Sequence, residues 1–189
     1  LHLCHHNLES IQTNNYNSSN AKHDLLAEVC LAAKFEGDSI RGDHAQYRAK
    51  NTDFNTTICT VLARSFADIG DIIRGKDLYR GNKQEKEQRD KLDDNLKTIF
   101  GKIHDDVTRG KNVALKTRYQ HDAPYYYKLR EDWWDANRGK VWEALTCEAY
   151  GTYFRHTCNG GKSSTPNKCR CEGANVVPTY FDYVPQYLR

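Results

Sequence analysis

Apolar residues recur at steps of three and four in two long stretches of the chain, which is the spacing of one helix face. The first stripe predicts a helix that ends at Gly75, because glycine commonly closes a helix. The second predicts one helix over residues 83–107, whose front half, residues 83–91, is almost wholly charged. At about 1.5 Å per residue this helix reaches nearly 40 Å, so we expect it to project beyond the core. The stripes consist of Ile58, Val61, Leu62, Phe66, Ile69, Ile72 and Ile73, and of Leu92, Leu96, Ile99, Phe100, Ile103 and Val107.

Capping residues predict two further helices. One runs from Asp24, a residue that favours the N-cap position, to a stop at Gly37. The other has Asp122 as its cap and Pro124 in its first turn, and it continues toward Cys147 with all three tryptophans. Both patterns favour a bundle of helices.

The remainder of the second half is rich in loop-forming residues. Residues 151–178 hold many Gly, Ser, Asn, Cys and Pro residues and predict a disulfide-pinned loop, and a short helix is expected to begin near Pro185. No segment has the length and regular alternation of a strand. The predicted fold class is therefore all-α, a disulfide-linked helical bundle with a loop-rich N-terminal part.

Seven cysteines favour a disulfide framework in an extracellular setting. They lack paired C-x-x-C units, which disfavours zinc, and the histidines around Cys4 have no second ligand group nearby, so we expect no metal. The pairing cannot be read from the spacing, and the odd count suggests a missing partner. Since the chain carries no secretion signal, an extracellular location implies a fragment of a longer protein. The cysteines expected in disulfides are Cys4, Cys30, Cys59, Cys147, Cys158, Cys169 and Cys171.

The charge is only mildly basic, with 28 Lys and Arg against 25 Asp and Glu, which is too weak to indicate a nucleic-acid partner. Residues 102–130 concentrate seven of the basic residues against three acids, and we expect a loop in the middle of this stretch. A polyanion can bind such a segment, although an ordinary solvated loop explains the charges better. No apolar run is long enough to cross a membrane.

No motif indicates catalysis or a cofactor. The chain lacks a glycine-rich phosphate loop, a nucleophile elbow and a zinc-protease helix, so we expect no enzyme and no cofactor. Arg41-Gly42-Asp43 matches the integrin-binding tripeptide in an expected loop, but chance explains three residues better. The run Tyr125-Tyr126-Tyr127 fits a core seal better than a binding interface.

Long strings of the sequence resemble the Duffy-binding-like domain, alpha class, of the variant erythrocyte membrane proteins of the malaria parasite Plasmodium falciparum. One such string is Lys128-Leu129-Arg130-Glu131-Asp132-Trp133-Trp134-Asp135-Ala136-Asn137-Arg138. The others are residues 1–4, 25–37, 63–79, 96–107, 141–147 and 177–189. Set against a full domain of the family, the resemblance implies that this sequence begins after an upstream segment that carries another cysteine and stops before the third subdomain. The odd cysteine count agrees with that departure.

The resemblance implies two subdomains, residues 1–56 with mixed loop and helix and residues 57–189 with the helical bundle. It also implies a non-enzymatic adhesion module on the outside of a membrane protein at the infected erythrocyte surface. Its expected partners are an erythrocyte receptor (complement receptor or blood-group glycan) or heparan sulfate, with antibodies as further partners, which would make it a rosetting and cytoadherence domain. The alternatives are a structural spacer that presents a neighbouring adhesive domain, or a domain of another class that binds an endothelial protein receptor.

In this family we expect receptor contacts in the divergent segments rather than in the matched strings. For a sulphated glycan, cation clusters are the expected contacts, because binding releases counterions from the polyanion. The predicted contacts are Arg109, Lys111, Lys116 and Arg118, followed by Lys83, Lys86, Arg89 and Lys91.

Overall fold

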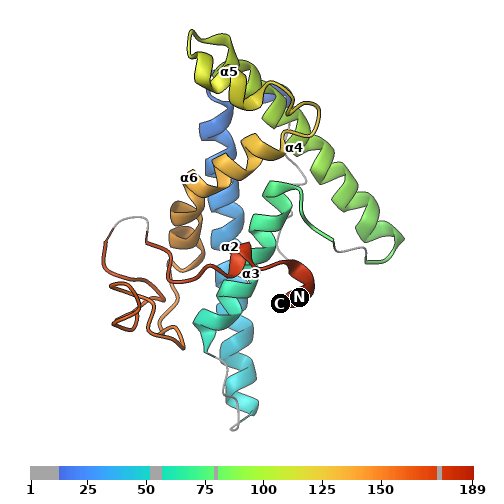
Figure 1. Ribbon diagram of the computed structural model, residues 1–189. Coiled ribbons are helices and arrows are strands. Elements are labelled where there is room, and N and C mark those ends of the chain that lie inside the picture. The colour runs from blue at the N-terminus through green and yellow to red at the C-terminus, as the bar shows by residue number, and fades with distance from the viewer. Residues whose placement is uncertain (1–12, 52–56, 79–80, 174–175) are drawn as a thin grey trace.

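The computed structural model describes residues 13–51, 57–78, 81–173 and 176–189, and its regular structure is helical. Within these ranges the only β contacts are two isolated bridges in the loop after the last long helix. The all-α prediction is confirmed. Figure 1 shows the α-helices, which are α2 (Ala21–Lys50), α3 (Ile58–Arg74), α4 (Lys83–Arg109), α5 (Val113–Tyr119) and α6 (Tyr127–Leu145); the 3-10 helices are η1 (Thr13–Asn15), η2 (Phe181–Tyr183) and η3 (Gln186–Leu188).

Helix α3 matches the prediction from its apolar stripe. Thr57 caps its start by accepting a hydrogen bond from the Thr60 amide at 3.3 Å, and Gly75 ends it in the left-handed conformation, with φ at 72°. A side chain at Gly75 would also meet the guanidinium of Arg130. Most residues of α3 are buried, so this helix forms the centre of the bundle.

Helix α4 begins at Lys83 as predicted and runs to Arg109. Asn82 and Glu85 form a capping box at its start, which satisfies free amide groups of the first turn. Its buried residues all lie between Leu92 and Ile103, so the first nine residues extend away from the body of the molecule (Figure 1).

Helix α2 is longer than predicted at both ends, because it begins at Ala21 and continues through Gly37 to Lys50. The predicted stop at Gly37 is wrong for a physical reason. A Cβ atom at this position would lie 2.0 Å from the Leu145 carbonyl oxygen, so glycine lets α2 approach the end of α6. Gly37 is a packing residue in the middle of a helix.

The tripeptide Arg41-Gly42-Asp43 lies within α2, so the loop expected there is wrong. All three residues are exposed, and buried positions of α2 end at Ile40. Beyond Ile40 the helix extends past the other helices at the bottom of Figure 1. Successive residues of a helix point in different directions, so the tripeptide does not form an extended loop.

Helix α6 uses the predicted cap with a different geometry. The Asp122 carboxylate accepts hydrogen bonds from the amides of Lys128 and Leu129 at 2.9 and 2.8 Å. Pro124 lies in the turn before the helix, after a cis peptide bond, and not in the first helical turn. The predicted first-turn role of this proline is therefore wrong.

The tryptophans of α6 are the centre of one continuous hydrophobic core. Trp134 and Trp142 each lie 5.1 Å from the Phe66 ring, and Trp133 meets Phe100 edge-on at 6.0 Å. Each of α2, α3, α4 and α6 contributes buried apolar residues to this cluster. The division at residue 56 stays a prediction, since α2 contributes to the same core as the later helices. None of the described helices is apolar over a length sufficient to span a bilayer.

The loop after α6 is pinned by disulfides, as predicted. Cys59 of α3 bonds Cys169 across 110 residues, and Cys158 bonds Cys171 within the loop. Among the described residues Cys30 and Cys147 have no disulfide partner, so their pairing stays a prediction. Cys30 lies near the charges of Lys140 and Glu143 of α6, and burial raises the pKa of its thiol. Cys4 and the histidines beside it lie outside the described residues.

Candidate functional site

The predicted cationic contacts lie at the two ends of α4. We call residues 83–91 the α4 arm and residues 109–118 the α4–α5 tip. Because α4 has 27 residues, its two ends lie roughly 40 Å apart. The eight cations therefore form two separate surfaces.

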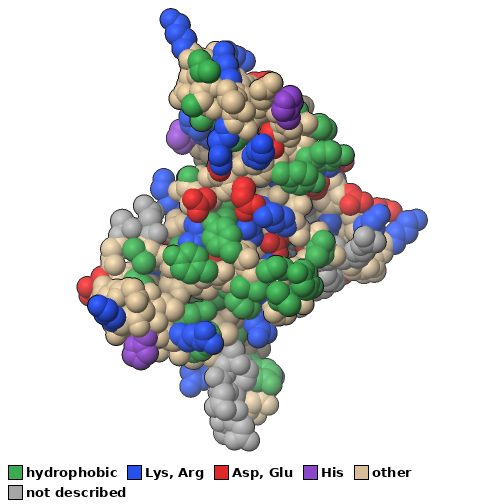
Figure 2. All heavy atoms as spheres, viewed as in Figure 1, with side chains coloured by type: hydrophobic (Ala, Val, Ile, Leu, Met, Phe, Trp, Pro, Cys, Tyr) green, Lys and Arg blue, Asp and Glu red, His purple; other side chains and the backbone are tan. Residues whose placement is uncertain are grey.

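The α4 arm carries nearly balanced charge. Its four basic residues accompany three acids, and Figure 2 shows red and blue side chains mixed at this end of the molecule. Lys86 lies 3.6 Å from Asp90, and Arg89 forms an ion pair with Asp77 in the segment after α3. These two cations also line a polar cavity of about 380 Å³ between the arm and that segment. Arg89 thus holds the arm to the body.

The α4–α5 tip has a one-sided charge. Residues 109–118 hold four basic residues and no acid, and Arg109, Lys111 and Lys116 are exposed. The sequence predicts a loop in the middle of residues 102–130, but residues 113–119 form the helix α5. Asn112 caps this helix by accepting from the amides of Ala114 and Leu115. The cations are therefore carried by an ordered turn and helix at the top of the molecule (Figure 2).

Arg118 has a structural partner. Its guanidinium donates two hydrogen bonds to the Asp132 carboxylate of α6, at 2.5 and 2.6 Å, and the Tyr119 hydroxyl donates a third at 2.7 Å. The hydrogen bonds from Arg118 hold the pKa of Asp132 below its ordinary value, although burial opposes this shift. Arg118 therefore links α5 to α6. Because its guanidinium is already paired, it is less available to a ligand than Arg109, Lys111 and Lys116.

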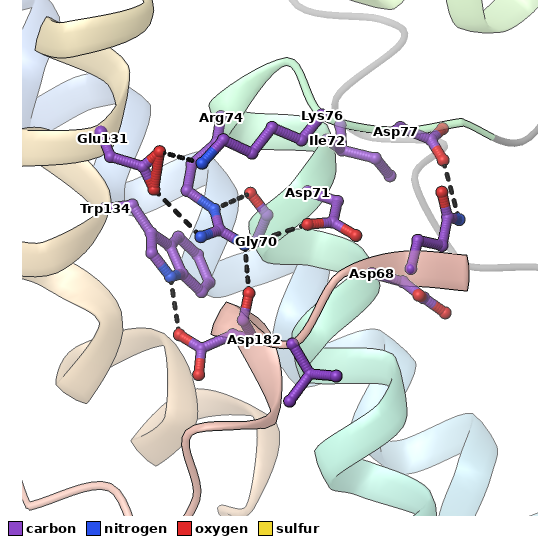
Figure 3. A network of polar contacts seen from close by, with 12 residues as sticks. Asp68, Gly70, Asp71, Ile72, Arg74, Lys76, Asp77, Glu131, Trp134 and Asp182 are labelled. Carbon is purple, nitrogen blue, oxygen red and sulfur yellow. Dashed lines mark hydrogen bonds and ion pairs between the residues drawn. The ribbon is translucent and has the colours of Figure 1, made fainter. Parts of the chain in front are cut away.

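A buried polar network joins the C-terminal segment to α3 and α6 (Figure 3). Arg74 donates to the Gly70 carbonyl, to Asp71 and Glu131, and to the Asp182 carbonyl. The Asp182 carboxylate accepts from Trp134 at 2.9 Å. Burial raises the pKa of Asp71, even though arginine partners lower it. These hydrogen bonds hold α3, α6 and the C-terminal segment together, which is a structural role.

The tyrosine run splits between two roles. Tyr126 packs against His104 with ring centroids 5.3 Å apart. Tyr125 and Tyr127 stack on each other at 5.5 Å and are about half exposed, with Lys97 over the Tyr125 ring. The expected core seal holds for Tyr126, while its two neighbours lie on the surface.

Sequence reasoning missed the acidic partners of the predicted cations. Asp77 and Asp132 lie 12 and 14 residues from Arg89 and Arg118, so no short-range pattern connects them. Asp182, the acceptor that links α6 to the C-terminal segment, is 44 residues from Arg138. Only the fold brings these charges together.

The family model described as Duffy binding domain matches residues 1–189 of the chain. Two solved structures from the varO strain of Plasmodium falciparum each align with 99% of the chain at a TM-score of 0.76. They are the NTS-DBL1α-1 domain of membrane protein 1 (PfEMP1), 42% identical, and the NTS-DBL1α and CIDRγ double domain, 43% identical. The chain covers 40% and 25% of their respective lengths.

A third structure, the ICAM-1-binding DBLβ domain of a PfEMP1 protein, is 34% identical with a TM-score of 0.67. It aligns with all of this chain, which covers 39% of its length. Comparison with curated proteins gives no match. The chain thus spans about two fifths of the length of the single domains that it resembles.

Proposed function

The chain belongs to the Duffy-binding domain family, and from this we propose that it is a host-cell adhesion module of a malaria-parasite surface antigen. The match over the whole chain carries this proposal. We place the module outside the infected erythrocyte, where it binds an erythrocyte receptor or a sulphated glycan of the heparan sulfate type. In this role it needs no catalytic group, and binding is partly electrostatic.

The α4–α5 tip is the proposed contact surface. Arg109, Lys111 and Lys116 are exposed on an ordered element without an acid in the same segment. Arg118 sets the position of this element through Asp132. The α4 arm is the second choice, because its acids offset its cations and Arg89 is held by Asp77.

Charge reversal at the tip tests this surface. The triple variant Arg109→Glu, Lys111→Glu and Lys116→Glu should leave immobilised heparin at lower salt than the original chain. Since each contact releases counterions, the loss of three should reduce the slope of log affinity against log salt by about two. The measurement is heparin affinity over a series of salt concentrations.

A matched control separates the tip from net charge. Lys34→Glu, Arg48→Glu and Arg64→Glu change the same number of exposed cations on α2 and α3. Equal retention of the two triple variants would remove the tip from the binding site. If the immobilised chain binds neither red cells nor glycans, the result would favour the alternative role as a structural spacer.

A protein receptor is the second candidate. The similar DBLβ domain binds ICAM-1, which favours an endothelial protein receptor as the alternative partner. This alternative would be supported if the chain bound immobilised ICAM-1 and the tip variant eluted from heparin at the same salt concentration as the original chain.

A further inference from the structure

A third cationic surface lies in the disulfide-pinned loop, which no matched string or predicted contact includes. We call residues 151–171 the clamped loop. It holds four Lys and Arg residues and a histidine, with no Asp or Glu. Figure 2 shows blue and purple side chains, with a red one beside them, at lower left, where Figure 1 places this loop.

The loop is held firmly to the helices beneath it. Cys169 is bonded to Cys59 of α3, and its carbonyl accepts a hydrogen bond from the Trp142 indole at 3.1 Å. Arg170 donates to the Thr146 hydroxyl at 2.8 Å and to the Glu143 carbonyl at 2.5 Å. One of the four cations is thus used to anchor the loop.

The other three cations are available to a ligand. Arg155 and Lys162 are exposed and Lys168 is partly exposed. Within the described ranges none of the three forms an ion pair; Arg155 lies over the Phe154 ring and Lys168 over the Tyr150 ring, at 5.1 and 5.2 Å. These charges are therefore not neutralised by the protein.

The two disulfides restrict the positions of Lys162 and Lys168. Lys162 lies in the turn that Cys158 and Ser163 close, and Lys168 lies in the turn that Asn167 and Arg170 close. The Cys158–Cys171 bond joins the two turns, with 5.4 Å between its Cα atoms. A preorganised backbone lowers the entropy cost of binding, because less chain must be ordered by the ligand.

The chemistry of the loop favours a sugar polymer over a protein. Residues 159–167 contain only Gly, Ser, Thr, Asn and Lys with one Pro, so they lack the apolar core of a typical protein interface. Hydroxyl and amide side chains suit the hydroxyl groups of sugars, and the Tyr150 ring, 68% exposed, offers a face for stacking. The cations suit sulphate or carboxylate groups on the same polymer.

We propose that the clamped loop is a binding surface for a sulphated polysaccharide, contacted by Arg155, Lys162 and Lys168. It adds a site distinct from the α4–α5 tip and shares the ligand class of the proposed function.

Three triple variants in one heparin assay test the loop and the tip separately. Arg155→Glu, Lys162→Glu and Lys168→Glu should lower the salt needed for elution below that of the control variant with Lys34→Glu, Arg48→Glu and Arg64→Glu. The slope of log affinity against log salt should fall by about two. The tip variant measured beside them reports on the proposed function alone. Circular dichroism melting confirms that each variant is folded.

The outcomes distinguish the two sites. Lower elution for the loop variant supports the inference, whether or not the tip variant also changes. If the loop variant elutes at the same salt concentration as the control variant, the inference about the clamped loop is overturned. If only the tip variant then elutes at lower salt, the proposed function still stands. Immobilised polyglutamate serves as the second probe, and retention on it equal to that on heparin would overturn the assignment to a sulphated polysaccharide.

Discussion

At the scale of single residues, buried charges decide how the C-terminal segment attaches to the bundle. Asp182 is 1% exposed, and its carboxylate receives hydrogen bonds from Trp134 and from Arg138, each at 2.8 to 2.9 Å. Arg138 is itself largely buried, so its charge depends on this partner. Removal of one member of such a buried pair strongly lowers the stability of the fold, because the charge of the other member is left buried without a partner.

Asp182→Ala should therefore lower the free energy of unfolding by about 3 to 5 kcal/mol. The measurement is urea denaturation. Asp135→Ala is the control, since Asp135 is exposed and accepts one hydrogen bond from the Tyr183 hydroxyl at 2.9 Å. Its cost should stay below about 1 kcal/mol. Similar losses for both variants would contradict the structural role of the Asp182 network.

At the scale of elements, the close crossing of α2 and α6 sets the architecture. Glycine at position 37 costs helix propensity of about 1 kcal/mol relative to alanine, and the structure offsets this by close packing against Leu145. Gly42 on the same helix has no atom within 4 Å of an added Cβ. The two glycines have the same local conformation and opposite surroundings.

This contrast predicts opposite signs for the same substitution. Gly37→Ala should destabilise the chain by about 1 to 3 kcal/mol, since the new methyl group forces the helices apart. Gly42→Ala should stabilise it by up to about 1 kcal/mol. Thermal and urea unfolding of the two variants provide the measurement, and stabilisation by both would refute the proposed crossing.

Helices α3 and α4 were predictable from sequence because an apolar stripe at helical spacing records the face that packs. The end of α2 was not predictable from the sequence, because a glycine that stops a helix cannot be told from a glycine that allows close packing. The same limit applies to the site. The positions of Arg109 and Arg118 were evident as charge, but the attachment of Arg118 to Asp132 depends on the meeting of α5 and α6.

At the scale of the whole molecule, one core and the two disulfides seen among the described residues hold three charged surfaces at different places. The α4 arm is nearly balanced in charge, whereas the α4–α5 tip and the clamped loop are purely basic among their charged residues. The Cys59–Cys169 bond joins the loop to the central helix across 110 residues. A rigid body with separate cationic surfaces suits attachment to an extended polyanion, because several weak contacts combine when their spacing is fixed.

Binding of the labelled chain to uninfected red cells tests the central claim most directly, with flow cytometry before and after enzymatic removal of heparan sulfate. We predict that the chain binds untreated cells, that removal of the glycan reduces this binding, and that raising the salt concentration reduces it further. A chain that binds neither the cells nor heparin at low salt would contradict the adhesion account.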